Sequence, residues 1–299
     1  MSSSVRDAQI AQVRSFNRVV TQRVGALHDH YLSRDRSLGE ARVLWEIGDG
    51  GADVRALRAR LDLDSGYLSR LLRSLESAGL VEVRPSADDR RVREVVLTDL
   101  GAKERAVLDR SSDALAGSML EPLSATQRER LVESMAEVER LLTATLVELR
   151  VVDPEHEHAQ HCIGQYFEEL TRRFPSGFDP AVSRRAAPEE MRPPNGLFLV
   201  ATLHGEPIGC GGLKFHPGEA TEVKRMWVDG SARGLGVGRR LLTRLEELAA
   251  EHGADAVQLD TNGNLREAIS MYRSSGYREV EPFNDEPYAD HWFEKRLDA

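Results

Sequence analysis

The sequence has few cysteines, no long apolar run and no excess of basic residues. Its two cysteines, Cys162 and Cys210, are too few for a disulfide framework, and neither lies in a metal-ligand spacing. No stretch approaches the ~18 apolar residues of a membrane-spanning helix. The first four residues lead into charged, helical sequence without the apolar segment of a signal peptide. We therefore expect a cytoplasmic protein that binds no metal ion and does not enter the membrane.

The lack of net positive charge limits how the protein can bind nucleic acid. The net charge is −9, of which residues 1–150 contribute −1 and residues 151–299 contribute −8. This balance argues against a polycation that coats nucleic acid without specificity, although locally placed arginines can still dock a duplex. The length of 299 residues favours two domains over one.

Residues 64–79 carry the clearest helical pattern of the first half, after weaker patterns at 5–31, 37–48 and 54–61. Asp64 is a suitable N-cap, and apolar residues at i, i+3, i+4 and i+7 fix one buried stripe: Leu68, Leu71, Leu72 and Leu75. The opposite face then carries Gly66, Arg70 and Arg73, with Ser69 to one side. Because arginine binds guanine edges through two hydrogen bonds, this face is suited to a major groove.

Residues 81–97 predict a basic hairpin directly after this helix. Gly79 ends the helix, and strands at 81–84 and 92–97 flank a turn at 85–90. Helix, helix and basic hairpin together indicate a winged helix-turn-helix. Within it, Asp89-x-Arg91 followed by Leu97-Thr98 resembles the D-x-R-x(5)-L-T signature of the MarR-family regulators.

The MarR resemblance implies roles for individual residues. Arg91 would reach the minor groove with Asp89 holding it, while the preceding helix would present Ser69, Arg70 and Arg73 to double-stranded DNA. The helices at both ends of the domain would pair with a second copy. A homodimer would then bind a palindromic operator whose half-sites lie about one helical turn apart. The simpler alternative is that these arginines are solvated surface charges.

No Gly/Ser/Pro-rich linker separates the two halves of the chain. Helices at 99–120 and 125–143 end the first half, and a strand at 146–152 begins the second. We therefore predict a winged-helix DNA-binding and dimerisation domain at 1–143 and a second domain at 144–299. So short a junction limits independent movement of the two domains.

The beginning of the second domain predicts a helix and a loop. Asp153-Pro154-Glu155 starts the helix well, with a capping carboxylate and a proline in the first turn. His156, His158 and His161 spread around this helix, which disfavours metal binding. Residues 181–196 are polar and contain prolines, so we expect a mobile loop there.

A glycine-rich turn farther along predicts an anion-binding site. The apolar strand Met226-Trp227-Val228 runs through a polar turn into Arg233-Gly234-Leu235-Gly236-Val237-Gly238, and an amphipathic helix follows. Glycines leave backbone N–H groups unshielded and the helix N-terminus adds partial positive charge, so a pyrophosphate fits there. The turn is not a P-loop, because no Gly-Lys-Ser/Thr closes it. Arg239 also replaces the third glycine of G-x-G-x-x-G.

The spacing Arg-x-x-Gly-x-Gly resembles the acyl-CoA signature of the GNAT N-acetyltransferases. The resemblance continues through Leu259-Asp260-Thr261-Asn262 to Met271-Tyr272-Arg273-Ser274-Ser275-Gly276-Tyr277, in the family's order of strand, helix and Tyr-x-x-x-Gly-Tyr. It implies a multidomain α+β chain: a mostly α winged helix-turn-helix, then an α/β mixed-sheet GNAT acyltransferase fold.

The same resemblance implies how acetyl-CoA, the co-substrate, is held. The side chain of Arg233 and the backbone N–H groups from Leu235 to Arg239 would bind the phosphates. The strand edge from Met226 to Val228 would pair with the pantetheine amides, and Asn262 would make a further contact with CoA. Asn262 is otherwise an ordinary turn residue.

Two residues are candidates for proton transfer. Glu222 matches a carboxylate that serves part of the family as base, directly or through water, and burial would raise its pKa toward the useful range. The alternatives are a solvated strand-start glutamate and a chain of waters. Tyr272 matches the tyrosine that protonates the leaving thiolate, and its alternative is simple packing.

Three functions remain open from the sequence. The leading one is a bifunctional protein, a DNA-binding regulator that also acetylates an amine, either a small molecule or a protein. The second is a transcription factor whose GNAT domain only senses acetyl-CoA or another small ligand. The third is an acetyltransferase whose winged helix only dimerises.

Overall fold

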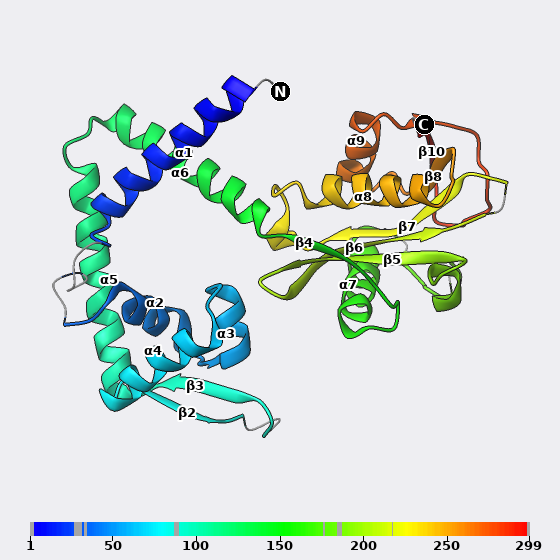
Figure 1. Cartoon of the computed structure of the whole chain (residues 1–299). Coiled ribbons are helices and arrows are strands. Elements are labelled where there is room, and N and C mark those ends of the chain that lie inside the picture. The colour runs from blue at the N-terminus through cyan, green and yellow to red at the C-terminus, as the bar shows by residue number, and fades with distance from the viewer. Residues whose placement is uncertain are drawn as a thin grey trace. The chain divides into compact units, whose positions relative to one another are not determined.

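The computed structural model describes residues 3–26, 32, 35–86, 90–175, 177–183, 187–216 and 218–297. The chain divides into two compact units, Met1–Glu133 and Ser134–Ala299 (Figure 1). The division falls inside one helix, α6 (Ala125–Thr145), near whose end the sequence places the domain boundary.

The first unit is mostly helical with a small antiparallel sheet. Its helices before α6 are α1 (Ser3–Arg23), α2 (Leu38–Ile47), α3 (Val54–Arg60), α4 (Ser65–Ser77) and α5 (Asp99–Leu120). The strands β1 (Ala52–Asp53), β2 (Val81–Pro85) and β3 (Arg93–Leu97) form a sheet in the order β1-β3-β2. The core contains Leu44, Leu57, Leu75 and Val95, all without exposed surface. The predicted winged helix-turn-helix is confirmed.

Local sequence signals account for α4. The Asp64 carboxylate accepts a hydrogen bond from the Tyr67 backbone N–H at 2.8 Å, which satisfies a donor of the first turn. The four leucines of the predicted stripe are all buried. Both the N-cap and the buried face of this helix were therefore predicted correctly.

The second unit is a seven-stranded sheet with helices on both faces. The strands are β4 (Glu148–Val152), β5 (Gly196–Leu203), β6 (Glu206–Lys214), β7 (Thr221–Val228), β8 (Ala256–Thr261), β9 (Arg278–Glu279) and β10 (His291–Arg296), in the order β4-β5-β6-β7-β8-β10-β9. Helix α7 (Glu157–Arg173) covers one face, and α8 (Val237–Glu251) and α9 (Arg266–Ser274) lie on the other (Figure 1). This arrangement confirms the predicted mixed-sheet α/β fold.

The strands β7 and β8 are parallel and separate soon after they meet. They pair only at Thr221↔Val257 and Glu222↔Gln258, while β7 stays paired with β6 as far as Val228. A register shift between β6 and β7, with the extra residue on β7, and a positive φ of 56° at Arg225 bend this part of the sheet. The edge of β7 toward Val228 is therefore not bonded to β8 and borders the site described below.

Two expectations for the start of this unit were wrong. The helix α7 begins at Glu157 with His156 as N-cap, whose Nδ1 accepts from the His158 N–H at 3.1 Å. The Asp153 carboxylate instead pairs with Arg192 at 2.6 Å and accepts from the Glu155 N–H at 2.8 Å, in the turn that precedes the helix. Within the expected mobile loop, the 3₁₀ helix η2 (Pro188–Met191) buries Met191 to 1% exposure, so part of that segment packs in the core.

Candidate active site and nucleic-acid interface

Two adjoining cavities lie where β7 and β8 separate. The larger, of about 500 Å³, is bordered by the end of β7, the glycine-rich turn and α9. The smaller, of about 100 Å³, is bordered by α7, β7, the end of β8 and the segment before β10. They share lining residues: Tyr166, Leu170, Met226, Leu265, Ala268 and Tyr272. A molecule in one cavity can therefore meet a molecule in the other.

The glycine-rich turn opens into the larger cavity. Gly236 is the N-cap of α8 with φ of 75°, and no side chain caps the helix there. A Cβ atom built on Gly236 would meet no atom within 4 Å. The first N–H groups of α8 therefore face open space, which is the arrangement that binds an anion.

Most of the predicted acyl-CoA ligands border this cavity. They are Met226, Val228, Arg233, Gly234, Gly236, Val237, Gly238 and Arg239. Leu235 is not among the lining residues and packs partly against the core. Asn262 borders the smaller cavity instead. Its amide donates to the Tyr288 carbonyl at 2.7 Å and accepts from the Asn264 N–H at 3.0 Å, so it holds a turn.

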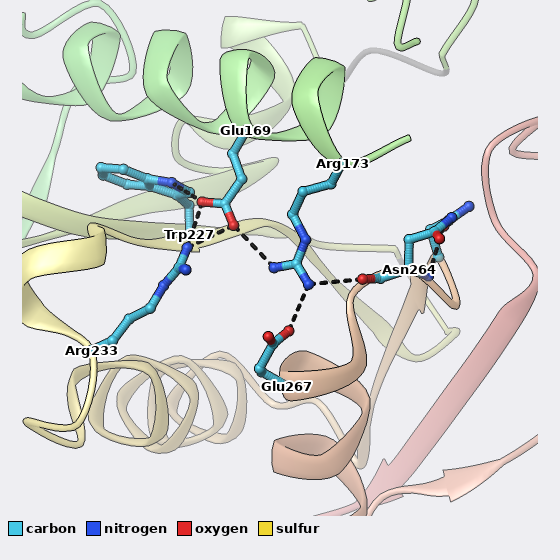
Figure 2. Close-up of polar contacts among 7 residues, drawn as sticks. Glu169, Arg173, Trp227, Arg233, Asn264 and Glu267 are labelled. Atoms are coloured by element: carbon cyan, nitrogen blue, oxygen red, sulfur yellow. Dashed lines mark hydrogen bonds and ion pairs between the residues drawn. The ribbon is translucent and has the colours of Figure 1, made fainter. Parts of the chain in front are cut away.

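The side chain of Arg233 is held by a carboxylate of α7 (Figure 2). Its Nη2 lies 2.6 and 2.8 Å from the two oxygens of Glu169. Glu169 also accepts from Trp227 Nε1 at 3.0 Å and from Arg173 Nη1 at 3.2 Å. The Arg233 side chain is 51% exposed, and the 12% exposed Glu169 keeps its hydrogen bonds to Trp227 and Arg173 when Arg233 moves. Arg233 can therefore exchange Glu169 for a phosphate at small cost.

The same network reaches across to α9. Arg173 Nη2 donates to Glu267 at 2.7 Å and to the Asn264 carbonyl at 2.8 Å (Figure 2). The hydrogen bond to Glu267 raises the pKa of the Arg173 guanidinium, which stays charged. Neither Glu169 nor Arg173 was predicted as a site residue. Their i, i+4 spacing on one helix was the single signal, and such pairs are common on any helix surface.

Tyr272 lies at the junction of the two cavities and is 5% exposed. Burial raises the pKa of its phenol above the ordinary value, and the Asp260 carboxylate adds to this effect. Among the described residues, none forms a hydrogen bond with its hydroxyl. The hydroxyl is therefore protonated at neutral pH and available to donate to a bound group.

Glu222 does not border either cavity, as far as the structure describes the lining. It is 7% exposed, and its carboxylate binds Lys224 Nζ at 2.6 Å and Asn284 Nδ2 at 3.1 Å. Lys224 also pairs at 2.6 Å with Asp260, which does border the smaller cavity. Burial opposes the charge of Lys224, but the carboxylates of Asp260 and Glu222 outweigh it and raise the pKa of the ammonium. The role of Glu222 as base remains a prediction.

Aromatic rings form one wall of the smaller cavity. Phe178 lies 4.9 Å from Tyr288, 5.6 Å from Phe167 and 6.0 Å from Phe174, measured between ring centroids. The carboxylate-bearing Glu286, 8% exposed, borders the same cavity and accepts from Ser183 Oγ at 3.1 Å. Because these residues come from three separate segments, no local sequence pattern indicated that they meet.

The predicted DNA-contacting residues of α4 are exposed. Arg70 and Arg73 lie opposite the buried leucines, with Ser69 to one side. The Arg70 guanidinium lies over the Tyr67 ring at 5.5 Å, and Arg73 Nε donates to the Ser69 carbonyl at 3.2 Å. Arg91 is exposed between β2 and β3, while Asp89 lies outside the described residues.

Within the described ranges, no three His, Cys, Asp or Glu side chains are grouped so that they could hold a metal ion. In the same part of the chain, no helix is long and apolar enough to cross a membrane.

Family comparisons match both halves. Residues 163–277 match the family described as acetyltransferase (GNAT) family, and residues 35–92 match the MarR family. An IAA acetyltransferase of Azospirillum brasilense is 35% identical over 130 residues, which cover 43% of this chain and 84% of that protein.

Two further similarities are more limited in extent. An uncharacterised N-acetyltransferase of Schizosaccharomyces pombe is 33% identical over 99 residues. The matched segment covers 32% of this chain and 60% of the yeast protein. The crystal structure of a GNAT-family acetyltransferase from Staphylococcus aureus is 20% identical with a TM-score of 0.45. It covers 50% of this chain and 100% of that one.

Proposed function

Because the chain belongs to the GNAT acetyltransferase family and carries a MarR-type winged helix-turn-helix, we propose a bifunctional protein. It binds an operator as a regulator and transfers an acetyl group from acetyl-CoA directly to an amine. The observation that carries the enzymatic half is the meeting of two cavities at Tyr272, one opening from the glycine-rich turn and one lined by aromatic and acidic side chains.

The larger cavity suits acetyl-CoA. Acetyl-CoA, when bound, supplies a thioester that carries the acetyl group. The open N-terminus of α8 at Gly236 offers backbone N–H groups to the pyrophosphate, and Arg233 adds a positive charge once it leaves Glu169. The edge of β7 from Met226 to Val228 offers main-chain groups to the pantetheine arm.

Tyr272 holds the proton that the departing thiolate takes up. Its buried hydroxyl is protonated and lies where the two cavities meet, so it is within reach of both ligands. A free thiol has a pKa of ~8.5, below that of the phenol, so Tyr272 first donates a hydrogen bond to the thiolate. When the proton moves to sulfur, the phenolate left behind is the stronger base and takes up the proton that the attacking amine nitrogen loses.

The amine must lose a proton before or during the transfer. Glu222 is the proposed acceptor, and since it does not border the smaller cavity among the described residues, the proton reaches it through water. Asp260 borders that cavity and shares Lys224 with Glu222. A change in the charge of Glu222 therefore alters the electrostatic environment of Asp260, and so of the cavity, through Lys224.

The smaller cavity supports an amine as acceptor. Glu286 offers a carboxylate to an ammonium group, whereas Asp260 is already paired with Lys224, and aromatic faces such as those of Phe178 and Tyr288 stabilise a cation further. A volume of about 100 Å³ admits the amine and a few adjoining atoms of the acceptor.

The first unit supports DNA binding by a dimer. Arg70 and Arg73 on α4 are proposed to contact base edges, Arg91 to enter the minor groove and Asp89 to hold it. The helix α1 exposes apolar residues at helical spacing, Ile10, Val13, Phe16 and Val20. A second copy of the chain would bury this stripe, and the resulting two-fold symmetry matches a palindromic operator.

Thiol release is the direct test of the enzymatic half. Purified protein is incubated with acetyl-CoA and a panel of amines and amino acids, and free thiol is followed with a colorimetric reagent. Acceptor-dependent release that Tyr272→Phe slows supports acyl transfer. If acetyl-CoA binds but no amine stimulates release, the GNAT domain is a sensor and the enzymatic proposal fails.

Gel shifts test the other half. The upstream region of the protein's own gene is titrated against a random duplex of equal length. Preferential binding of the upstream fragment supports a regulator. Equal affinity for both duplexes would leave an acetyltransferase whose winged helix serves only to dimerise.

A further inference from the structure

The end of helix α6 belongs to the second unit and is bonded to the helix of the glycine-rich turn. Arg240, in the first turn of α8, donates to the Ala144 carbonyl at 2.5 Å and to the Val147 carbonyl at 2.8 Å. These are carbonyls at and just after the C-terminus of α6, which have no partner within the helix. The last turns of α6 are therefore fixed beside the N-terminus of α8.

Arg140 on this part of α6 lies against the turn itself. Its Cδ atom is 3.8 Å from the position that a Cβ on Gly234 would occupy. Its side chain is 49% exposed, and it forms an ion pair with Glu137, which is also about half exposed and lies three residues earlier on the same helix. An exposed pair of this type contributes little, so the guanidinium can leave Glu137 for a stronger anion.

The other arginines of the turn have partners within the protein. Arg239 Nη2 donates to Ser274 Oγ at 2.9 Å and Arg240 is bound by the α6 carbonyls, while Arg233, paired with Glu169, is already assigned to the pyrophosphate. Coenzyme A carries a pyrophosphate and a separate 3′-phosphate. The N–H groups of one turn match the pyrophosphate, and the remaining charge requires a further cation near the turn.

We propose that Arg140 of α6 is a phosphate ligand of acyl-CoA. This inference rests on the proposed acyl-CoA site and adds to it a residue outside the part of the chain that matches the acetyltransferase family, residues 163–277. The helix α6 starts at Ala125 in the first unit and ends in the second, so one continuous helix joins the winged-helix unit to the cofactor. A ligand bound to this helix is in a position to influence both units.

Affinities for two forms of the cofactor test the assignment. Acetyl-CoA and 3′-dephospho-acetyl-CoA are titrated by calorimetry into full-length wild type, Arg140→Ala and Arg140→Lys, at two salt concentrations. Arg130→Ala, which removes another exposed arginine from α6, is the matched control. Circular dichroism melts verify that each variant is folded.

We expect Arg140→Ala to raise the Kd for acetyl-CoA about tenfold, the effect of losing one charge-assisted hydrogen bond. Arg140→Lys should restore part of the affinity and Arg130→Ala should bind normally. If wild type and Arg140→Ala bind 3′-dephospho-acetyl-CoA with equal affinity, the group that Arg140 binds is the 3′-phosphate. If Arg140→Ala weakens the binding of both forms by the same factor, Arg140 binds the pyrophosphate.

Two results would overturn the inference, and they differ. A folded Arg140→Ala protein with the wild-type Kd for acetyl-CoA at both salt concentrations removes Arg140 from the site but leaves the proposed function intact. Wild-type protein that fails to bind acetyl-CoA at all would refute the proposed acetyl-CoA site together with the role of Arg140.

Discussion

Replacing Gly236 by alanine should separate cofactor binding from folding. Gly236 has φ of 75°, a conformation in which an L-residue costs about 1–2 kcal/mol relative to glycine. The added methyl group meets no protein atom within 4 Å, so it causes no clash in the fold. It points instead into open space at the N-terminus of α8, where the phosphates are proposed to lie.

The expected loss of affinity follows from the hydrogen bonds at the turn. A methyl group at this position keeps the pyrophosphate from the N–H groups that would bind it. Losing two charge-assisted hydrogen bonds, at about 1.5 kcal/mol each, weakens binding by about 3 kcal/mol, or roughly 100-fold in Kd. A tryptophan at the same position should abolish binding.

Gly253 provides a matched control at the other end of α8. It also has positive φ, 82°, and a Cβ there would likewise meet no atom within 4 Å, but it borders neither cavity. Both alanine variants should melt about 2–8 °C below wild type, because both have the same backbone strain. Calorimetry should show that Gly236→Ala alone loses acetyl-CoA. Equal affinities of the two variants would refute the phosphate site at this turn.

Four further outcomes are expected. Tyr272→Phe should lower kcat by ~10² or more with little change in the Kd for acetyl-CoA, and wild-type turnover would reduce Tyr272 to packing. Glu222→Gln should shift the pH profile of kcat, whereas an unshifted profile would assign the proton to a water chain. Arg70→Ala should cost about 1–3 kcal/mol and relax operator preference, while Arg91→Ala should lower the salt slope of DNA binding by about one. Saturating acetyl-CoA should change operator affinity at least about fivefold in gel shifts, less so in Arg140→Ala, and an unchanged affinity would exclude coupling through α6.

Local patterns in the sequence predicted the elements well where the signal lies within a few residues. The stripe from Leu68 to Leu75 and the Asp64 cap were both correct, because periodicity and capping depend on neighbours in the same helix. The cap at Asp153 was wrong for a tertiary reason. Arg192, 39 residues away, binds that carboxylate, which also accepts from the Glu155 N–H in the turn before the helix start at Glu157.

The residues of the site divide in the same way. The turn from Arg233 to Gly238 and the position of Tyr272 could be predicted from the sequence, because each belongs to a short motif. The ion-pair partner of Arg233 could not be predicted from the sequence, since Glu169 is 64 residues away along the chain. The contacts of the Glu222 carboxylate likewise include Asn284, which is 62 residues away in the sequence.

The sequence by itself determined the two families, both confirmed by the comparisons, together with the order of the helices and strands and the glycine-rich turn. These depend on spacing and backbone preference, which act over a few residues. Only the tertiary structure decided which side chains surround the cavities and that Arg140 lies against Gly234. Those contacts follow from the separation of β7 from β8 and from the packing of α6 beside α8, and no local pattern encodes either distance.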